Sequence, residues 1–117
     1  MKNEESNQLG ADLSNLLNDK KGKHLEQVIE KTIADRMILK EVLKGLRSKK
    51  ETFRYNCFKV LFQISKTQPL LLFSEWEYFL DLLDSPNSYH RMSAIYILSN
   101  LTSVDTEKKF DLIYRLK

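Results

Sequence analysis

The chain has 117 residues, of which 42% are apolar and 30% charged, a balance typical of a folded domain and unlike that of a disordered chain. The longest apolar run covers residues 94–98, and it is far shorter than the roughly 20 residues of a membrane helix, so we expect no membrane span. The net charge of +3 is unevenly spread: residues 1–67 have 14 Lys and Arg against 9 Asp and Glu, and residues 68–117 have 5 against 7.

Apolar residues recur at helical spacing along most of the chain, and no Asn-Gly or Asp-Gly hairpin turn competes with helix formation. We predict about seven helices, over residues 4–18, 23–34, 35–46, 51–66, 74–84, 88–102 and 105–117, with a turn at 18–22 and a short helical turn at 70–73. Asp35 is expected to cap the third helix, Asp105 the last, and Ser74 to form a capping box with Glu77.

The short connections between these helices predict antiparallel helix pairs. The apolar positions of each helical pattern predict the core, which includes Leu13, Leu17, Val28, Met37, Ile38, Val42, Leu43, Leu46, Phe53, Cys57, Val60, Leu61, Ile64, Trp76, Phe79, Leu80, Leu83, Ala94, Ile97, Leu98 and Leu101.

An internal repeat with an offset of 37 residues relates residues 43–65 to residues 80–102 without a gap, and five of the 23 positions are identical. Such a period is typical of repeats built from a pair of helices. The identical pairs are Leu43 and Leu80, Leu46 and Leu83, Ser48 and Ser85, Arg54 and Arg91, and Leu61 and Leu98.

The repeat resembles the HEAT-like repeats of the armadillo superfamily, in which a helix ending in Leu-Leu is followed by a turn and then by Val-Arg-x-x-Ala-x-x-Ala-Leu. Residues 82–83, 90–94 and 97–98 fit this frame, as do residues 53–57 and 60–61. The two aspartates usual in the family's turn are absent, and His90 stands where a small aliphatic residue is usual. The resemblance implies an all-α fold, a short α-α superhelix or solenoid.

This resemblance predicts a single repeat domain over residues 1–117. It contains a degenerate first helix pair at 4–34, repeats at 36–66 and 69–102, and an incomplete third repeat at 105–117. It also implies that Arg54 and Arg91 are structural residues that bond to the turns. The apolar residues of 105–117 leave two expectations open: the chain is a fragment of a longer protein, or its last helix docks on another copy.

The second helix of each pair lines the concave side in this architecture, and we expect an unidentified protein to bind there. The positions predicted to face away from the core form a polar row with one aromatic residue, which suits a protein-binding surface. These positions are Asn56, Lys59, Gln63, Ser93, Tyr96 and Asn100. The chain is therefore predicted to be a protein-binding scaffold.

A second hypothesis is weak DNA binding through a basic stripe over residues 40–50, because neutralised phosphates give salt-dependent affinity. The stripe is defined as Lys40, Lys44 and Arg47 on one helix face, continued by Lys49 and Lys50 in the turn.

No motif of catalytic or metal chemistry stands out. His24, His90 and Cys57 have no metal-ligand spacing, and the three glycines are isolated, so no phosphate loop forms. We expect no enzymatic activity, no cofactor and no metal. The polar first ten residues do not resemble a signal peptide, and one cysteine cannot form an intramolecular disulfide, so a cytoplasmic location is expected.

Overall fold

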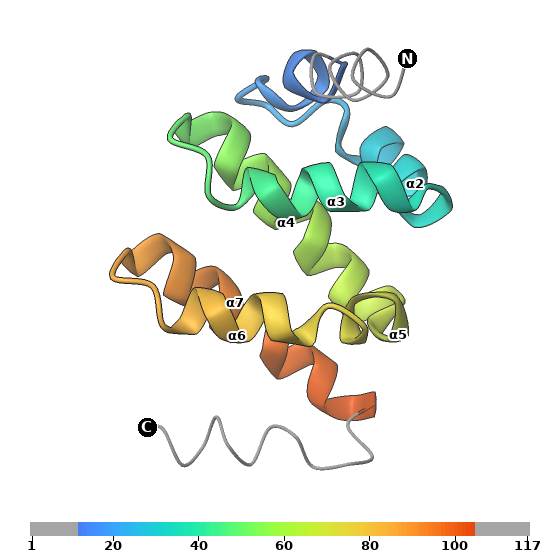
Figure 1. Ribbon diagram of the computed structural model, residues 1–117. Coiled ribbons are helices and arrows are strands. Elements are labelled where there is room, and N and C mark those ends of the chain that lie inside the picture. Colours follow the sequence, from blue (N-terminus) through green and yellow to red (C-terminus); the bar gives the residue numbers. More distant parts are fainter. Residues whose placement is uncertain (1–11, 105–117) are drawn as a thin grey trace. The chain divides into compact units, whose positions relative to one another are not determined.

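The computed structural model describes residues 12–104, and every secondary-structure element in that range is helical (Figure 1). Residues 12–17 are helical. They are followed by α2 (Leu25–Ala34), α3 (Arg36–Gly45), α4 (Glu51–Thr67), α5 (Pro69–Phe73), α6 (Trp76–Leu83), α7 (Ser88–Leu101) and the 3-10 turn η1 (Thr102–Val104). The all-α prediction is confirmed, and the five predicted helices between residues 23 and 102 agree with the observed bounds to within two residues. The predictions for residues 4–11 and for 105–117, including the Asp105 cap, lie outside the described residues.

The chain divides into two compact units between Ile64 and Ser65, inside α4. The first unit is described over residues 12–64 and the second over residues 65–104. The predictions of one domain over 1–117 and of a superhelix remain predictions.

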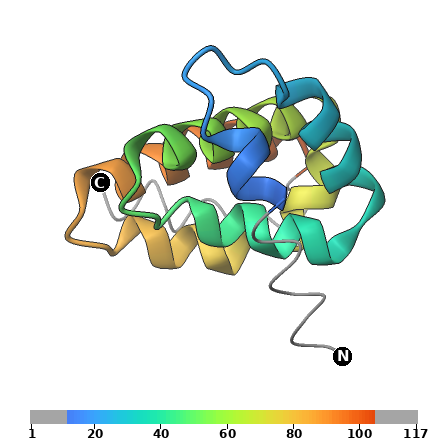
Figure 2. The same ribbon diagram turned by 90° about the horizontal axis from the view of Figure 1, so that it is seen from above.

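The first unit begins with the helix of residues 12–17 and a loop that arches from it to α2 (Figure 2). The Asp19 carboxylate accepts hydrogen bonds from the backbone N–H groups of Lys23 at 3.0 Å and Lys21 at 3.1 Å. These two donors hold the pKa of Asp19 below its ordinary value, because they favour the charged carboxylate. Gly22 adopts φ +64°, the left-handed conformation that glycine tolerates best. The predicted turn at 18–22 is confirmed.

Asp35 separates α2 from α3 and caps α3, since its Oδ1 accepts a hydrogen bond from the N–H of Met37 at 2.9 Å. This cap was predicted and is confirmed. The predicted burial of Met37 is wrong, because its side chain is 50% exposed. The buried residues of α3 follow the 3.6-residue period from Ile38, and Met37 falls on the opposite face, where Lys40 and Lys44 also lie.

Helices α3 and α4 approach closely at Gly45. A methyl group added to Gly45 would overlap the Sγ of Cys57 and crowd the ring of Phe53. Cys57 is fully buried, as expected for the small packing position of the repeat. The first unit's core therefore depends on one small residue from each helix.

In the second unit, α6 packs against α7, and the core of this pair with α5 comprises Leu72, Phe79, Leu82, Ala94, Ile97, Leu98 and Leu101. The predicted capping box is wrong: Glu75 precedes α6 without a side-chain capping bond. Ser74 instead ends α5 and donates from Oγ to the carbonyl of Leu71 at 3.1 Å. Because α5 occupies residues 69–73, the Ser74 hydroxyl satisfies one of that helix's last carbonyls. Four residues of the predicted core are only half-buried: Phe53 in the first unit, and Trp76, Leu80 and Leu83 in the second.

The turn before α4 and the turn before α7 have the same internal hydrogen bonds at the 37-residue offset. Ser48 Oγ accepts from the N–H of Lys50 at 3.1 Å, and Ser85 Oγ accepts from the N–H of Asn87 at 3.1 Å. The backbone repeats as well: Ser48 N–H donates to Gly45 O, and Ser85 N–H donates to Leu82 O.

The two repeat arginines, Arg54 and Arg91, also make equivalent hydrogen bonds to these two turns. Arg54 donates from Nη1 to the carbonyl of Ser48 at 3.2 Å, and Arg91 donates from Nη1 to the carbonyl of Ser85 at 2.9 Å. Each arginine thus bonds the carbonyl six residues before it. The sequence offset corresponds to two turns with the same local geometry, one in each unit.

Candidate protein-binding surface

Helix α7 has a buried face and an exposed face of quite different composition. The Asn87 side chain starts the helix by accepting from the N–H groups of Tyr89 at 2.8 Å and His90 at 3.3 Å. The buried face consists of Ser93, Ala94, Ile97, Leu98 and Leu101.

The exposed face of α7 is apolar and uncharged. Four large side chains lie on it with about half of their surface accessible: Tyr89 (51%), Met92 (48%), Ile95 (44%) and Tyr96 (50%). Their spacing of three, three and one residues places them within one helix face. The other exposed residues between 88 and 104 are Ser88, Ser99, Thr102 and Ser103, so no charged residue interrupts it. Hereafter Tyr89, Met92, Ile95 and Tyr96 are called the α7 apolar face.

Of the predicted binding row, Tyr96 lies on this face, but Asn56 does not face solvent. Asn56 is 2% exposed, and its Nδ2 donates to the carbonyls of Leu17 at 2.7 Å and Asp19 at 2.9 Å. The prediction that Asn56 faces away from the core is therefore wrong. The end of the helix at residues 12–17 leaves the Leu17 carbonyl without a helical partner, and Asn56 donates both to it and to the Asp19 carbonyl in the following loop.

Ser93 is also buried, at 7% exposure, so its predicted outward position is wrong. It lies on α7 beside Ala94, where a small side chain fits between packed helices. Asn100 is half-buried and donates from Nδ2 to Oγ of the buried Ser65 at 2.9 Å. Asn100 was expected to face away from the core because it is polar, but its side chain has a hydrogen-bonding partner inside the second unit.

In the first unit, Lys59 and Gln63 lie on α4 with a set of aromatic side chains. The rings of Tyr55 and Phe58 stack at 6.4 Å between centroids, and those of Phe58 and Phe62 at 5.5 Å. Lys59 Nζ lies 4.4 Å from the centre of the Tyr55 ring, a cation–π distance. Gln63 is exposed and Lys59 half-buried. The aromatic set occupies positions equivalent to Met92, Ile95 and Ser99 at the 37-residue offset.

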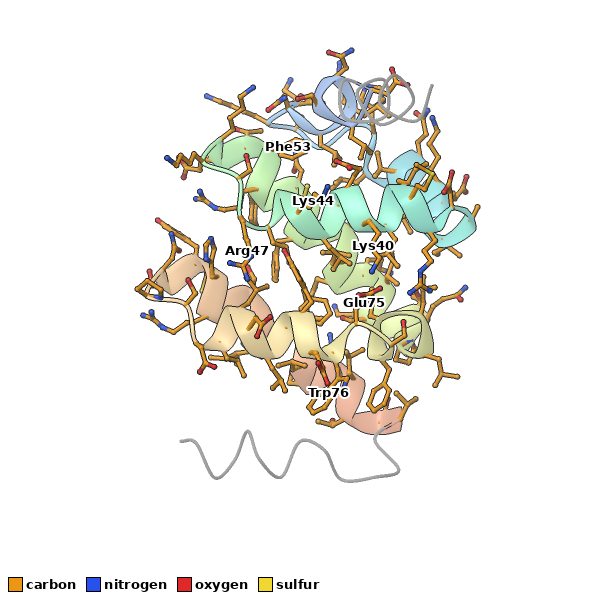
Figure 3. All side chains as sticks on the ribbon, viewed as in Figure 1. Lys40, Lys44, Arg47, Phe53, Glu75 and Trp76 are labelled. Atoms are coloured by element: carbon orange, nitrogen blue, oxygen red, sulfur yellow. The ribbon has the colours of Figure 1, made fainter. Side chains whose placement is uncertain are left out.

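All five residues of the basic stripe are exposed. Lys40 and Lys44 lie on α3, and Arg47 lies in the turn that follows it (Figure 3). Lys44 Nζ lies 3.4 Å from Glu41 Oε1 on the same helix. Lys49 and Lys50 continue the charge into the turn before α4.

Chemically reactive groups are sparse among residues 12–104. Burial raises the pKa of the Cys57 thiol to about 12, which keeps the thiol protonated and unreactive at neutral pH. His90 Nδ1 lies 2.8 Å from Ser85 Oγ, a hydroxyl that also accepts from the turn. Within the same range, no cluster of three metal-ligating side chains occurs and no helix is long and apolar enough to cross a membrane.

A shallow, open hollow of about 330 Å³ lies in the first unit, lined by Lys20, Glu51, Thr52, Tyr55 and Asn56. Of these lining residues, Asn56 is occupied by its hydrogen bonds to the carbonyls of Leu17 and Asp19.

Comparison with protein-family models, with curated proteins and with solved structures gives no match to this chain.

Proposed function

We propose that this chain is a protein-binding scaffold of HEAT-like helix-pair repeats whose partner contacts the α7 apolar face. The observation that carries the proposal is the composition of that face: four half-exposed apolar side chains and no exposed charge between residues 88 and 104. In a chain with 30% charged residues, an uncharged exposed helix face indicates an interaction surface. Tyrosine and methionine are also enriched at protein interfaces.

The chemistry of the face defines the kind of partner. A partner segment that buries the α7 apolar face must itself be apolar at its centre. An amphipathic helix with an uncharged stripe meets this requirement. The shared turn geometry of residues 46–50 and 83–87 supports the repeat architecture on which this proposal rests.

The experiment compares partner capture by three forms of the protein. Fully burying a side chain of this size contributes about 1.5–3 kcal/mol, so two half-exposed side chains together contribute roughly 2 kcal/mol. We therefore expect Met92→Lys combined with Tyr96→Lys to weaken binding by at least about 30-fold. Leu70→Lys is the matched control, because Leu70 is 71% exposed in the same unit but lies on α5.

A partner that is retained by the wild type and by Leu70→Lys, and lost by the double variant, supports the proposal. Circular dichroism and urea unfolding must show that both variants remain folded. Equal loss of all partners in both lysine variants would contradict it, since the effect would then reflect a general change in surface hydrophobicity.

A second candidate function is DNA binding through the basic stripe, favoured by the exposure of all five cations on α3 and the following turn. Titration of labelled duplex DNA against salt tests it. If Lys40, Lys44 and Arg47 each contact a phosphate, their replacement by glutamine lowers the slope of log K against log salt by about 2.7. Absence of binding at low salt rules this function out.

A further inference from the structure

A hollow and a lysine-rich loop lie next to each other in the first unit. The loop of residues 18–24, which arches towards α2 (Figure 2), contains Lys20, Lys21 and Lys23, and all three side chains are exposed. Lys20 also lines the hollow of about 330 Å³, together with Tyr55 of α4. Ligand pockets have volumes of about 300–1,000 Å³, so this hollow is large enough for one small planar group.

Hydrogen bonds fix this loop beside Tyr55. The side chain of Asn56, the next residue of α4, donates to the carbonyls of Leu17 and Asp19. The Asp19 carboxylate accepts from two backbone N–H groups later in the loop, at 3.0 and 3.1 Å. None of these bonds uses a lysine side chain. The loop is therefore fixed before any ligand arrives, and a fixed loop loses little conformational freedom on binding.

Tyr55 presents an aromatic surface next to a positive charge. Its side chain is 56% exposed, and Lys59 Nζ lies over the ring, 4.4 Å from its centre. At the 37-residue offset, Tyr55 and Lys59 correspond to Met92 and Tyr96 of the α7 apolar face. The equivalent surfaces of the two units therefore differ in chemistry, since one is aromatic and basic and the other is apolar and uncharged.

Positive charge predominates around the hollow. Residues 18–24 and the hollow's lining together contain three lysines against two acids, Asp19 and Glu51, and Lys59 adds a further positive charge over the Tyr55 ring. The Asp19 carboxylate is engaged by backbone N–H groups, which leaves Glu51 as the acid that a bound anion must avoid. A ligand that combines a planar ring with several anionic groups matches this arrangement.

We propose that the hollow and the loop of residues 18–24 bind single-stranded nucleic acid, with one base stacked on Tyr55 and the adjoining phosphates near the loop lysines. Single strands are generally bound by aromatic side chains combined with positive charge along the backbone. A base inside a duplex is stacked between its neighbours and does not reach such a ring. The inference uses neither the α7 apolar face nor the basic stripe, so it is independent of both functions proposed above.

Fluorescence anisotropy of a labelled oligo(dT) of about ten nucleotides, titrated with the full chain at low salt, measures this binding. A strand of the same length without bases carries the same phosphates and isolates the contribution of stacking. Tyr55→Ala should weaken oligo(dT) binding at least about fivefold and leave binding of the base-free strand unchanged. Tyr55→Phe retains the ring and should bind like the wild type.

The loop lysines are tested by K20Q/K21Q/K23Q. If each lysine neutralises one phosphate, this variant should lower the slope of log K against log salt by about 2. Because Asp19 accepts from backbone N–H groups, the substitutions leave the loop's hydrogen bonds in place.

The matched control is K40Q/K44Q/R47Q, which removes three positive charges from exposed positions of the same unit. It should retain the wild-type affinity and salt slope for oligo(dT). The variant M92K/Y96K should also bind oligo(dT) normally, so failure of the protein-binding proposal and failure of this one are distinguishable.

Photo-cross-linking locates the base without any substitution in the protein, which keeps the proposal testable if Tyr55→Ala does not fold. With 5-bromouracil in place of thymine, the cross-link should form at Tyr55, in the tryptic peptide of residues 55–59.

Four results would overturn the proposal. The wild type could fail to bind oligo(dT) at low salt. The base-free strand could bind as tightly as oligo(dT), which would show that charge alone is recognised. The control on α3 and its following turn could lose binding while the loop variant retains it. Finally, the cross-links could form only on α3 or α7.

Discussion

The side-chain amide of Asn56 donates a hydrogen bond of 2.7 Å to the backbone carbonyl of Leu17, 39 positions earlier in the chain. Its second bond, to the carbonyl of Asp19 at 2.9 Å, fixes the loop that follows the first described helix. One side chain of α4 therefore holds both the end of a helix and the start of a loop. The local structure of residues 17–23 depends on a residue that no local sequence pattern connects to it.

Asn56→Ala should lower the free energy of unfolding by about 1–3 kcal/mol, because two carbonyls lose their donor inside the protein. Asn56→Asp should be at least as harmful at neutral pH, since a carboxylate cannot donate to a carbonyl. Urea unfolding measures both effects. Gln27→Ala removes an exposed amide from the same unit and should change stability by less than about 0.5 kcal/mol; a similar loss in this control would argue against the specific role of Asn56.

Arg91→Gln should destabilise the second unit by about 1–2 kcal/mol, because the guanidinium donates to the carbonyl of Ser85 from a partly buried position. Arg54→Gln should have a comparable effect, since its bond to Ser48 is equivalent. Hydrogen exchange should increase at the N–H of Asn87 in the first variant and of Lys50 in the second, as each turn loosens. Uniformly increased exchange along the whole chain would contradict a local role in the turn.

Gly45→Ala should destabilise the protein by about 1–3 kcal/mol, although alanine favours helix formation by about 1 kcal/mol over glycine. The added methyl group would occupy the space of the Cys57 sulfur. In combination with Cys57→Ala, much of this penalty should disappear, so the two changes should not be additive. Additive losses in a double-mutant cycle measured by urea unfolding would show that α3 and α4 do not compete for this space.

Cys57 should make stability fall with pH in the alkaline range. Burial raises the pKa of its thiol from 9.0 to about 12, so the unfolded chain loses the proton at lower pH than the folded protein. The stabilisation is complete below pH 9.0 and is lost as the pH rises towards 12. The difference in unfolding free energy between wild type and Cys57→Ala, which cancels other titrations, should shrink through this window. A constant difference would show that the thiol titrates normally in the folded protein.

Much of the fold follows from sequence periodicity because helices are local structures. The spacing of apolar residues gave the bounds of α2, α3, α4, α6 and α7 closely, and Asp35 marked the start of α3 correctly. The capping box at Ser74 failed because the same serine satisfies α5, which ends immediately before it. A capping motif indicates which bonds a side chain can make. When two neighbouring helices can both use that side chain, the bond that forms depends on the tertiary structure.

The candidate surface was only partly predictable. Tyr96 was identified, whereas Tyr89, Met92 and Ile95 were missed, because exposed positions were expected to be polar. The signal that could have found them was the doubly apolar pattern of α7, with Ala94, Ile97, Leu98 and Leu101 on one face and large apolar residues on the other. A helix with one buried and one exposed apolar face indicates a binding surface.

The sequence by itself determined the helical class and the 37-residue repeat, since both depend on spacing along one chain. Only the tertiary structure decided which polar side chains turn inward. Asn56 is buried because carbonyls from residues 17 and 19 require a donor, and Ser93 because α7 needs a small residue in its packed face. Met37 is exposed for the complementary reason: the register set by Ile38 places it on the face of α3 opposite the buried residues. Burial depends on what each residue meets across the fold, and no periodic pattern within one helix contains that information.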